Sequence, residues 1–510
     1  MKRIKPAQNG FTIVELLIVI VVIGILAAIT IVSFNGVQQR AGAAVLQSDL
    51  RSAATQLEIV SIDTGSYPGN TSELRKSEGT TFEYTNNGSS YCLTASSQVA
   101  QASYYFDSTE GAISEGSCPT HNGFLATIGP WTDIDAGMQY YACGIANGDA
   151  YCWGSALSGQ LGNGSTSGSV LSPTLVEGLL TGRTVTDIET GERHTCAVAD
   201  GDAFCWGAGA NGALGNGSTD SSSVPVAVSM DGELAGKEVT KIGVGRYYNT
   251  CAIADGEVYC WGYRPSDGWG GGFEAYAQVN PWKVQTSGVL NGRTVTDVSV
   301  GYQHVCVVAG GEAFCWGYGA NGVLGNGSTA TQQHPVAVST SGVLQGRTVT
   351  AVDTTDAHTC AIADSRAFCW GEQTAGEFGQ GKLGDGTSNS SSVPVEVSVA
   401  GVLAGKDVTS ISAGSRHSCA VADGEPVCWG NGSGVGLGAA APFNTTVPLL
   451  MEHDGAMELR PMEQISAGNY MSCALGLQGD AYCWGTGTDG LLGNGQTGGS
   501  QVPVRVNDPS

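Results

Sequence analysis

The hydrophobic pattern begins with one long apolar segment. Residues 11–32 are almost entirely apolar, and Glu15 is their sole charged residue. A helix of this length spans a bilayer. Because Lys2, Arg3 and Lys5 precede the segment, the positive-inside rule keeps that end in the cytoplasm. We therefore expect everything after about residue 40 to be exported.

The start of this segment departs from an ordinary signal peptide, because a Gly-Phe junction precedes the apolar run and an acid lies inside it. Gly10, Phe11 and Glu15, with the apolar residues behind them, resemble the type IV prepilin signature. The resemblance implies that prepilin peptidase removes the leader, residues 1–10, and methylates the new amine of Phe11. It also implies that Glu15 pairs with the N-terminal amine of another pilin subunit during assembly on an inner-membrane platform. The alternative is an uncleaved signal anchor, which has no use for Glu15.

A smaller unit follows the apolar segment. Helical spacing continues to about residue 62, so the expected N-terminal helix covers residues 11–64 and is transmembrane until assembly. Residues 65–122 contain a turn and then short strands separated by Asn-Gly and Glu-Gly turns, which predicts a small pilin sheet. We expect Cys92 and Cys118 to form a disulfide, as pilins often have; two free thiols are the alternative.

From residue 131 the pattern becomes repetitive, and Cys-Trp-Gly marks each copy. Neighbouring copies are roughly 55 residues apart, a period typical of propellers or solenoids of short strands. The marker cysteines are Cys152, Cys205, Cys260, Cys315, Cys369, Cys428 and Cys483. Seven copies predict a closed ring over residues 123–510.

Each marker cysteine has a second cysteine upstream. In the second copy, a two-residue turn at Asp200-Gly201 places Cys196 directly opposite Cys205, within disulfide reach. The upstream cysteines of the other copies are Cys143, Cys251, Cys306, Cys360, Cys419 and Cys473. We expect seven disulfides and hence an oxidising compartment. Zinc is the alternative, but its cysteine pairs usually have only two to four residues between them.

The remaining parts of each repeat complete a four-stranded blade. One strand precedes the hairpin, and another begins at Val-Pro or His-Pro, as suits an outer edge. Together with Leu-Gly-x-Gly, the repeat resembles the regulator of chromosome condensation repeat family. The expected fold is mainly β, a seven-bladed propeller after an α+β pilin module. The resemblance implies binding of other macromolecules; the nuclear member's nucleotide exchange does not transfer to an exported acidic chain.

Charge and composition narrow the function. The chain has 46 acidic and 22 basic residues, a net charge of -24, so nucleic acid is not an expected partner. No catalytic constellation, metal motif or cofactor motif recurs at mechanistic spacing. We expect no enzyme, no cofactor and no metal.

Two sets of side chains remain as candidate sites. One slot holds His194, His304, His358 and His417, which favour packing over a metal ring because Tyr141 and Met471 interrupt the series. The third copy carries an aromatic loop whose members either bind sugars or protein, or fold into a local plug. These ligand-binding candidates are Trp269, Phe273, Tyr276 and Trp282. The fifth copy inserts residues 372–382, with no recognisable chemistry.

The expected function is that of a minor or tip pilin that presents a propeller to an extracellular protein or glycan receptor. It would reside in the cytoplasmic membrane before assembly, with its C-terminus outside, and afterwards in a pilus at the cell surface. Two alternatives stay open: a pseudopilin of a type II-like secretion system that binds exported cargo, and a surface enzyme that acts on glycans.

Overall fold

A computed structural model gives the fold. It describes residues 45–57, 60–61, 67, 74–77, 80–86, 91–97, 102–108, 112–115 and 130–509, the last range without 247, 264–276, 286–287, 374–379, 432–443 and 452–460. The chain divides into two compact units, residues 1–128 and 129–510. The boundary expected between residues 122 and 123 falls outside the described residues and stays a prediction.

The first unit packs one helix on one sheet. The helix covers residues 45–57, and the antiparallel sheet has the order β1 (Thr81–Asn86), β2 (Tyr91–Ser97), β3 (Ala102–Asp107), β4 (Ala112–Glu115). Leu46, Leu50 and Leu57 lie at helical spacing and are fully buried against Tyr91 and Leu93 of β2. The pilin identity of this unit stays a prediction. Among the described helices none is long and apolar enough to cross a membrane, and residues 11–32 are not described.

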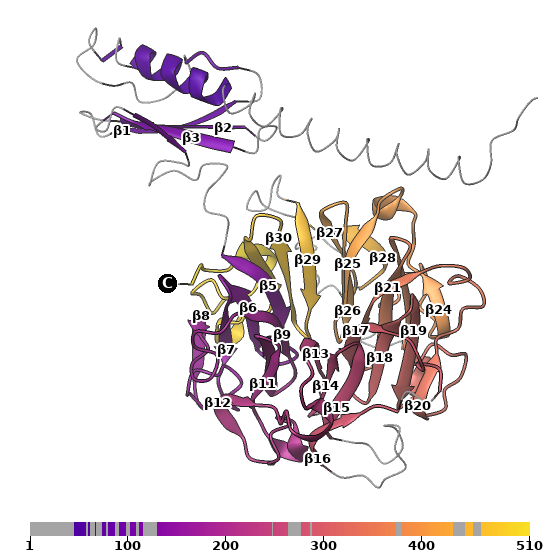
Figure 1. Ribbon diagram of the computed structural model, residues 1–510. Coiled ribbons are helices and arrows are strands. Elements are labelled where there is room, and N and C mark those ends of the chain that lie inside the picture. Colours follow the sequence, from indigo (N-terminus) through magenta and orange to yellow (C-terminus); the bar gives the residue numbers. More distant parts are fainter. Residues whose placement is uncertain are drawn as a thin grey trace, which may run out of the picture. The chain divides into compact units, whose positions relative to one another are not determined.

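The second unit is mainly β and contains seven four-stranded antiparallel sheets, here called blades 1 to 7 (Figure 1). The eighth sheet of the chain is the one in the first unit. The innermost strands are β5 (Trp131–Ala136), β9 (Val185–Thr190), β13 (Val239–Val244), β17 (Val295–Val300), β21 (Val349–Thr354), β25 (Val408–Ala413) and β29 (Met462–Ala467). The second strands are β6 (Tyr141–Ala146), β10 (His194–Ala199), β14 (Asn249–Ala254), β18 (His304–Ala309), β22 (His358–Ala363), β26 (His417–Ala422) and β30 (Met471–Gly476).

Each blade is completed by two outer strands. The third strands are β7 (Asp149–Ser155), β11 (Asp202–Gly207), β15 (Glu257–Gly262), β19 (Glu312–Gly317), β23 (Arg366–Gly371), β27 (Glu425–Asn431) and β31 (Ala481–Gly485). The fourth are β8 (Ser169–Leu175), β12 (Ser222–Ala227), β16 (Gln278–Lys283), β20 (Gln332–Ala337), β24 (Ser391–Glu396), β28 (Asn444–Leu450) and β32 (Ser500–Arg505). Short 3-10 helices are η1 (Ala210–Gly212), η2 (Gly232–Leu234), η3 (Ala320–Gly322), η4 (Gly401–Leu403) and η5 (Thr488–Gly490). The expected four-stranded blades are present, and proline lies on the outermost strand, but this strand begins two residues before the expected Val-Pro or His-Pro, as at Ser222 of β12.

The hairpin between the second and third strands follows from its turn residues. Asp200 and Gly201 have φ of 51° and 81°, the left-handed backbone that a type I′ turn needs at both central positions. This turn sets the register, so Ala199 pairs with Asp202 and Cys196 pairs with Cys205. The other five two-residue turns also have positive φ at both residues. In blade 7 the turn is one residue longer, and Gly479 has a φ of 73°.

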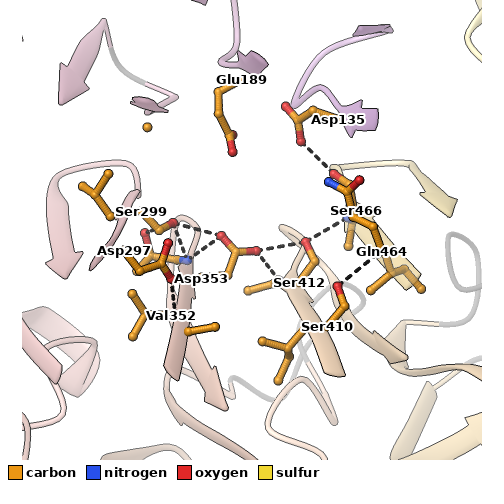
Figure 2. A pocket seen from close by; sticks show the side chains of 18 of the residues that line it. Asp135, Glu189, Asp297, Ser299, Val352, Asp353, Ser410, Ser412, Gln464 and Ser466 are labelled. Atoms are coloured by element: carbon orange, nitrogen blue, oxygen red, sulfur yellow. Dashed lines mark hydrogen bonds between the residues drawn. The ribbon is translucent and has the colours of Figure 1, made fainter. Parts of the chain in front are cut away.

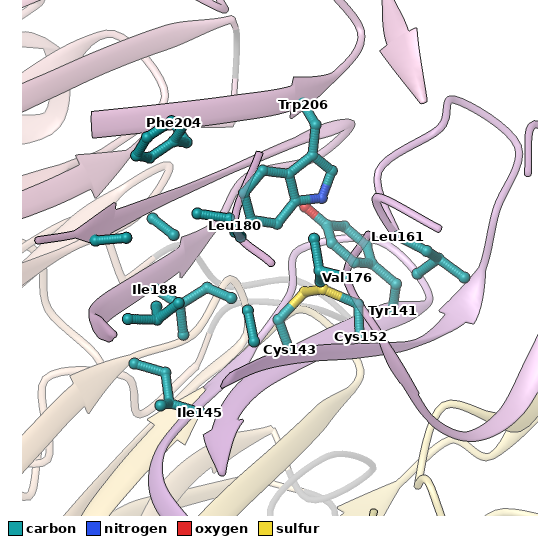
Figure 3. Close-up of a cluster of buried hydrophobic side chains, with 14 of the residues drawn as sticks. Tyr141, Cys143, Ile145, Cys152, Leu161, Val176, Leu180, Ile188, Phe204 and Trp206 are labelled. Carbon is teal, nitrogen blue, oxygen red and sulfur yellow. A yellow bond between two sulfur atoms is a disulfide. The ribbon is translucent and has the colours of Figure 1, made fainter. Parts of the chain in front are cut away.

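The hydrophobic core lies between neighbouring blades rather than within one. Figure 3 shows the core between blades 1 and 2, where Ile145 and the disulfide of Cys143 and Cys152 face Phe204 and Trp206. Similar clusters occur at the next blade junctions, and one of them joins Trp131 and Trp153 of blade 1 to Met471 and other residues of blade 7. A blade therefore buries its apolar faces only when both neighbours are present.

The ring closes without exchanging a strand. Every sheet consists of four consecutive strands, and the last sheet runs from β29 to β32. Blades 7 and 1 are joined by Trp131 N, which donates to Gly479 O at 3.2 Å, and by Trp153 Nε1, which donates to Leu491 O at 3.0 Å. Closure therefore depends on contacts between complete blades.

Candidate functional site

The seven hairpin disulfides are present in the expected pairings. The bonded cysteines are Cys143–Cys152, Cys196–Cys205, Cys251–Cys260, Cys306–Cys315, Cys360–Cys369, Cys419–Cys428 and Cys473–Cys483. Their Cα atoms are 4.0 to 4.1 Å apart, as in the non-hydrogen-bonded pairs of a hairpin. Cys92 is also disulfide-bonded, whereas Cys118, its expected partner, lies outside the described residues.

Several other expected site residues cannot be placed. The processing and assembly residues Gly10, Phe11 and Glu15 lie outside the described residues, as do the ligand-binding candidates Trp269, Phe273 and Tyr276. Their roles stay predictions.

The fourth aromatic candidate, Trp282, is placed on the outermost strand of blade 3. It lies on β16 opposite Cys260, and 37% of its surface is exposed. Beside it is a hollow of about 20 Å³ that Trp261 and Tyr263 also line. A hollow of that volume has room for little more than one water molecule.

The repeated histidines connect neighbouring blades. The Nε2 atoms of His194, His358 and His417 lie 2.9, 2.7 and 2.6 Å from the hydroxyls of Thr250, Ser418 and Ser472, each in the following blade. Burial lowers the pKa of His194 to about 3 and that of His417 to about 4, so both imidazoles are neutral at pH 7. Within the described part of the chain no cluster of three or more potential metal-ligating side chains occurs. The packing interpretation of this slot agrees with these contacts.

The marker tryptophans also join blades. Trp206 Nε1 donates at 2.8 Å to the carbonyl of Gln160, which lies in the loop that continues as Leu-Gly-Asn-Gly in blade 1. Gly162 of that loop has a φ of 67°, and a Cβ added there would lie 2.8 Å from the indole nitrogen. Gln160 therefore provides the acceptor, and Gly162 the space, for the next blade's indole.

A central cavity was not expected from the sequence. It has a volume of about 250 Å³ and is lined by the innermost strands of all seven blades. Two positions of each strand form two rings of residues, and all of these residues except Asp133 and Asp187 line the cavity. The third-position ring is Asp133, Asp187, Lys241, Asp297, Ala351, Ser410 and Gln464, and the fifth-position ring is Asp135, Glu189, Gly243, Ser299, Asp353, Ser412 and Ser466.

Most of these polar side chains accept a hydrogen bond from the backbone of the next blade. Figure 2 shows part of this network, in which Asp353 and Ser412 are joined. The bonds from backbone N–H groups are Ile242 to Asp187 (2.6 Å), Val352 to Asp297 (2.8 Å), Ile465 to Ser410 (3.1 Å), Thr190 to Asp135 (2.7 Å), Thr354 to Ser299 (2.9 Å), Ala413 to Asp353 (2.8 Å), Ala467 to Ser412 (2.9 Å) and Ala136 to Ser466 (2.9 Å). The rings thus pair N–H groups that the edges of six innermost strands, all except β17, would otherwise leave unsatisfied.

The two rings are strongly acidic, with six carboxyl groups and one amine, and four of these carboxyl groups line the cavity. Burial raises the pKa of Asp187 to about 7 and that of Asp353 to about 6. Burial and the neighbouring Asp135 and Asp187 carboxylates raise the pKa of Glu189 well above its usual value. Burial lowers the pKa of Lys241, but the adjacent Asp297 and Asp187 carboxylates outweigh it and raise that pKa. Lys241 Nζ lies 2.5 Å from Asp297 Oδ1 and is therefore charged.

One end of the propeller carries the loops between the first and second strands, opposite the hairpin turns. In these loops the residue before the histidine slot forms what we call the rim ring. Its members are Tyr140, Arg193, Tyr248, Gln303, Ala357, Arg416 and Tyr470. Beside it, Arg246 of blade 3 pairs with Glu192 of blade 2 at 3.0 Å and with Asp356 of blade 5. This arginine links three blades across the ring.

The sequence contained signals for both features. Aligning the seven innermost strands places Asp187 and Glu189 two residues apart, on one side of a strand. Aligning the loops places tyrosine or arginine in five of the seven rim positions. Neither set forms a known motif, so comparison with known motifs does not identify these residues.

Comparison with known proteins agrees with this architecture. Models described as "Regulator of chromosome condensation (RCC1) repeat" match residues 147–198, 200–252, 310–362 and 364–421, and a second RCC1 model matches residues 463–491. The unit is therefore a β-propeller built from RCC1 repeats. A model described as "Prokaryotic N-terminal methylation motif" matches residues 5–31. The chain thus carries a prepilin-type methylation motif and an RCC1-repeat propeller in one polypeptide.

Individual relatives resemble the propeller. The human E3 ubiquitin-protein ligase HERC2 is 32% identical over 298 residues, which are 57% of this chain and only 6% of HERC2. The ultraviolet-B receptor UVR8 of Arabidopsis thaliana is 28% identical over 372 residues, 71% of this chain and 79% of UVR8. Among solved structures, human WBSCR16 has a TM-score of 0.60 at 22% identity, covering 70% of this chain and 94% of its own. Yeast RCC1 (Prp20) bound to Kap60 has a TM-score of 0.59 at 23% identity, covering 70% and 83%. At these identities the solved structures share the fold alone.

Proposed function

We propose that the chain is a minor or tip subunit of a type IV pilus, and that its propeller binds an extracellular protein or glycan. The observation that carries this proposal is the methylation motif over residues 5–31 in the same chain as an RCC1-repeat propeller with seven disulfides. The motif supports assembly into a pilus-like filament. The disulfides support residence in an oxidising compartment outside the cytoplasm.

The propeller is better suited to binding than to catalysis. Most polar side chains of its central cavity are held in hydrogen bonds between blades, so they support the ring. Blade loops, by contrast, present varied side chains from a rigid framework, which is how many scaffolds present binding residues. We therefore propose a binding module that lacks enzymatic activity.

The position in the filament follows from size. A unit of about 380 residues is roughly 50 Å across by the scaling of compact domains. If every subunit of a thin filament carried one, neighbouring propellers would crowd each other. A low copy number or a tip location is therefore expected.

Immunogold labelling with antibodies against the propeller tests this proposal. Sparse or terminal labelling of filaments is expected, whereas dense labelling along the shaft would contradict a minor or tip role. Peptide mass spectrometry of the assembled protein should find an N-methylated Phe11 as the first residue. Glu15→Ala should leave that processing intact and remove the protein from filaments. If labelling occurs only in cells that are actively secreting enzymes, the pseudopilin alternative is favoured.

A further inference from the structure

A preformed aromatic stack occupies the rim ring where the last blades meet the first. The guanidinium of Arg416 in blade 6 lies 4.5 Å from the ring centroid of Tyr470 in blade 7, and its Nη2 donates to Tyr470 Oη at 3.1 Å. Tyr470 stacks in turn on Tyr140 of blade 1, with centroids 5.7 Å apart and an interplanar angle of 6°. Tyr140 is the outermost layer, and 37% of its surface is exposed. Three adjacent blades therefore hold one tyrosine ring in a fixed orientation.

The backbone of Tyr140 adds to this observation. Its φ is 43°, a left-handed conformation that is strained for a bulky side chain. The loops of blades 1 and 3 are one residue longer than most of the others, and the rim residue of blade 3, Tyr248, has a φ of 61°. Such strain costs about 1–3 kcal/mol and persists mainly at functional sites.

An arginine lies in the equivalent position of the next blade. Tyr141 Oη donates to the carbonyl of His194 at 2.9 Å and Gln139 Nε2 donates to Glu192 at 2.8 Å, so the loops that carry Tyr140 and Arg193 adjoin. Arg193 Nε lies 3.5 Å from Glu192, and nearly half of its side chain is exposed. Within the described residues Arg193 has no ion-pair partner besides Glu192, and its guanidinium carries two terminal amino groups. These two groups form the fork that binds a carboxylate with two parallel hydrogen bonds.

The charge distribution favours an acidic ligand at this end. The described rim ring has two arginines and no carboxylate, although the chain as a whole has a net charge of -24. The opposite end carries ten acidic side chains in and beside the hairpin turns, eight of them ion-paired with lysine or arginine: Asp149, Asp200, Asp202, Asp255, Glu257, Glu312, Asp364, Asp423, Glu425 and Asp480. The loops at the rim hold three arginines, Arg246 included, against the two carboxylates Glu192 and Asp356, so an acidic ligand meets less negative charge there.

The composition of the rim ring favours a polysaccharide over a protein. None of its seven members is an aliphatic residue larger than alanine. A stable protein interface needs an apolar core that buries about 800 Å² on each partner. A sugar needs less: its C–H face packs on an aromatic ring, and its hydroxyl and carboxylate groups bond to planar donors.

We infer that Tyr140 and Arg193 form a subsite for an acidic polysaccharide, in which Tyr140 stacks on a sugar ring and Arg193 binds the carboxylate of a uronic acid. The inference rests on the proposed binding function and assigns it to one end of the propeller. Arg416 and Tyr470 act as positioning residues, because they hold Tyr140 from behind.

To test the inference, polygalacturonate is titrated into the full-length protein, purified in detergent, and binding is measured by calorimetry. Polygalacturonate should bind, and its methyl ester and neutral amylose should bind at least about tenfold more weakly. Tyr140→Ala and Arg193→Gln should each weaken binding about tenfold or more, whereas Tyr140→Phe should retain it. The matched controls are Tyr318→Ala, which removes a half-exposed tyrosine of blade 4, and Arg366→Gln, which removes an arginine at the turn end.

The inference is overturned if polygalacturonate does not bind, if its methyl ester binds equally well, or if the control variants lose as much affinity as the rim variants. Binding only to a protein ligand would also overturn it. Unchanged thermal unfolding of the variants separates lost contacts from lost folding. Immunogold labelling distinguishes the two proposals: propellers on filaments that ignore polygalacturonate contradict the subsite alone, and their absence from filaments contradicts the pilus role.

Discussion

Ser466 of blade 7 donates a hydrogen bond from its hydroxyl to Asp135 Oδ1 of blade 1 at 2.7 Å, and the same hydroxyl accepts one from the N–H of Ala136 at 2.9 Å. Ser412 of blade 6 likewise donates to a carboxylate, that of Asp353 in blade 5, and accepts from the N–H of Ala467 in blade 7. Each serine bonds to one carboxylate and one backbone N–H, but only Ser466 joins the last blade of the ring to the first. This difference allows the closing junction to be tested separately.

Ser466→Ala should destabilise the propeller by about 1–3 kcal/mol, because it removes one hydrogen bond to a carboxylate and leaves a backbone N–H unpaired. Ser412→Ala is the matched control and should have a similar equilibrium cost. If the ring opens first between blades 7 and 1, Ser466→Ala should increase the unfolding rate in guanidinium more than Ser412→Ala does. Equal rates for both variants would show that the closing junction is no weaker than the others.

Gly162→Ala should cost more stability than Gly164→Ala. Both glycines have positive φ, 67° and 80°. Alanine at either position therefore adopts a left-handed backbone conformation, which costs about 1 kcal/mol. Only the Cβ at position 162 meets the indole of Trp206, at 2.8 Å, whereas nothing lies within 4 Å of a Cβ at position 164. The extra cost for position 162 should be about 1–3 kcal/mol, as for other overpacked sites. Chemical denaturation measures the difference, and equal costs would mean that the loop moves away from the indole freely.

The seven hairpin disulfides should resist reduction in the folded protein. Nearly all of their sulfurs are inaccessible, as at Cys196 and Cys205, which are 0% exposed. Cys92 is half-buried and serves as an internal control. Dithiothreitol followed by alkylation and mass spectrometry should modify Cys92 first, and the hairpin cysteines only in denaturant. Early modification of hairpin cysteines would indicate that blades open independently.

Stability should rise as the pH falls from about 8 to about 6.5; at lower pH this gain is opposed by the buried His194 and His417, whose folded pKa values of about 3 and about 4 lie below the unfolded value of 6.5. The folded pKa values of Asp187 and Asp353, about 7 and about 6, are above their unfolded value of 3.8. A folded pKa above the unfolded one gives stability that is present at low pH and lost as the pH rises through the folded pKa. Thermal unfolding across this range measures the effect.

Asp187→Asn separates the charge from the hydrogen bond. The amide oxygen still accepts the N–H of Ile242, but no buried charge forms, so the variant should be more stable than the wild type by about 1–2 kcal/mol at pH 8 and equal to it near pH 4. Glu463→Gln is the control, because it neutralises an exposed acid on an innermost strand outside the cavity. A variant that is destabilised at pH 8 would show that Lys241 depends on the Asp187 charge.

Much of the propeller could be predicted because its information is local. An Asp-Gly turn fixes the register of its hairpin, and the register alone places Cys196 opposite Cys205. Because the sequence repeats, the same local hairpin structure forms seven times. Contacts between blades were harder to predict: His194 bonds to Thr250 and Trp206 bonds to the carbonyl of Gln160, partners about 50 residues apart that no local pattern links.

The central cavity and the rim could not be predicted because they exist only after closure. Asp187 appears in the sequence as an ordinary exposed acid of a strand, and only the ring places it beside Lys241 and the N–H of Ile242. Tyr140 and Tyr470 are 330 positions apart and meet only because blade 7 reaches blade 1. A position-by-position analysis has no means of joining such residues.

The hairpin bridges also determine how the protein would respond to tension. The chain enters the propeller at β5, an edge strand whose backbone bonds within its sheet are to β6 alone. A pull from the N-terminal side would peel β5 away and then reach Cys143, where the covalent bridge passes the force directly to Cys152 on β7. The turn between them would carry no strain. The first step of unfolding would then release the length of β5 alone, because the covalent bridge holds the chain beyond Cys143.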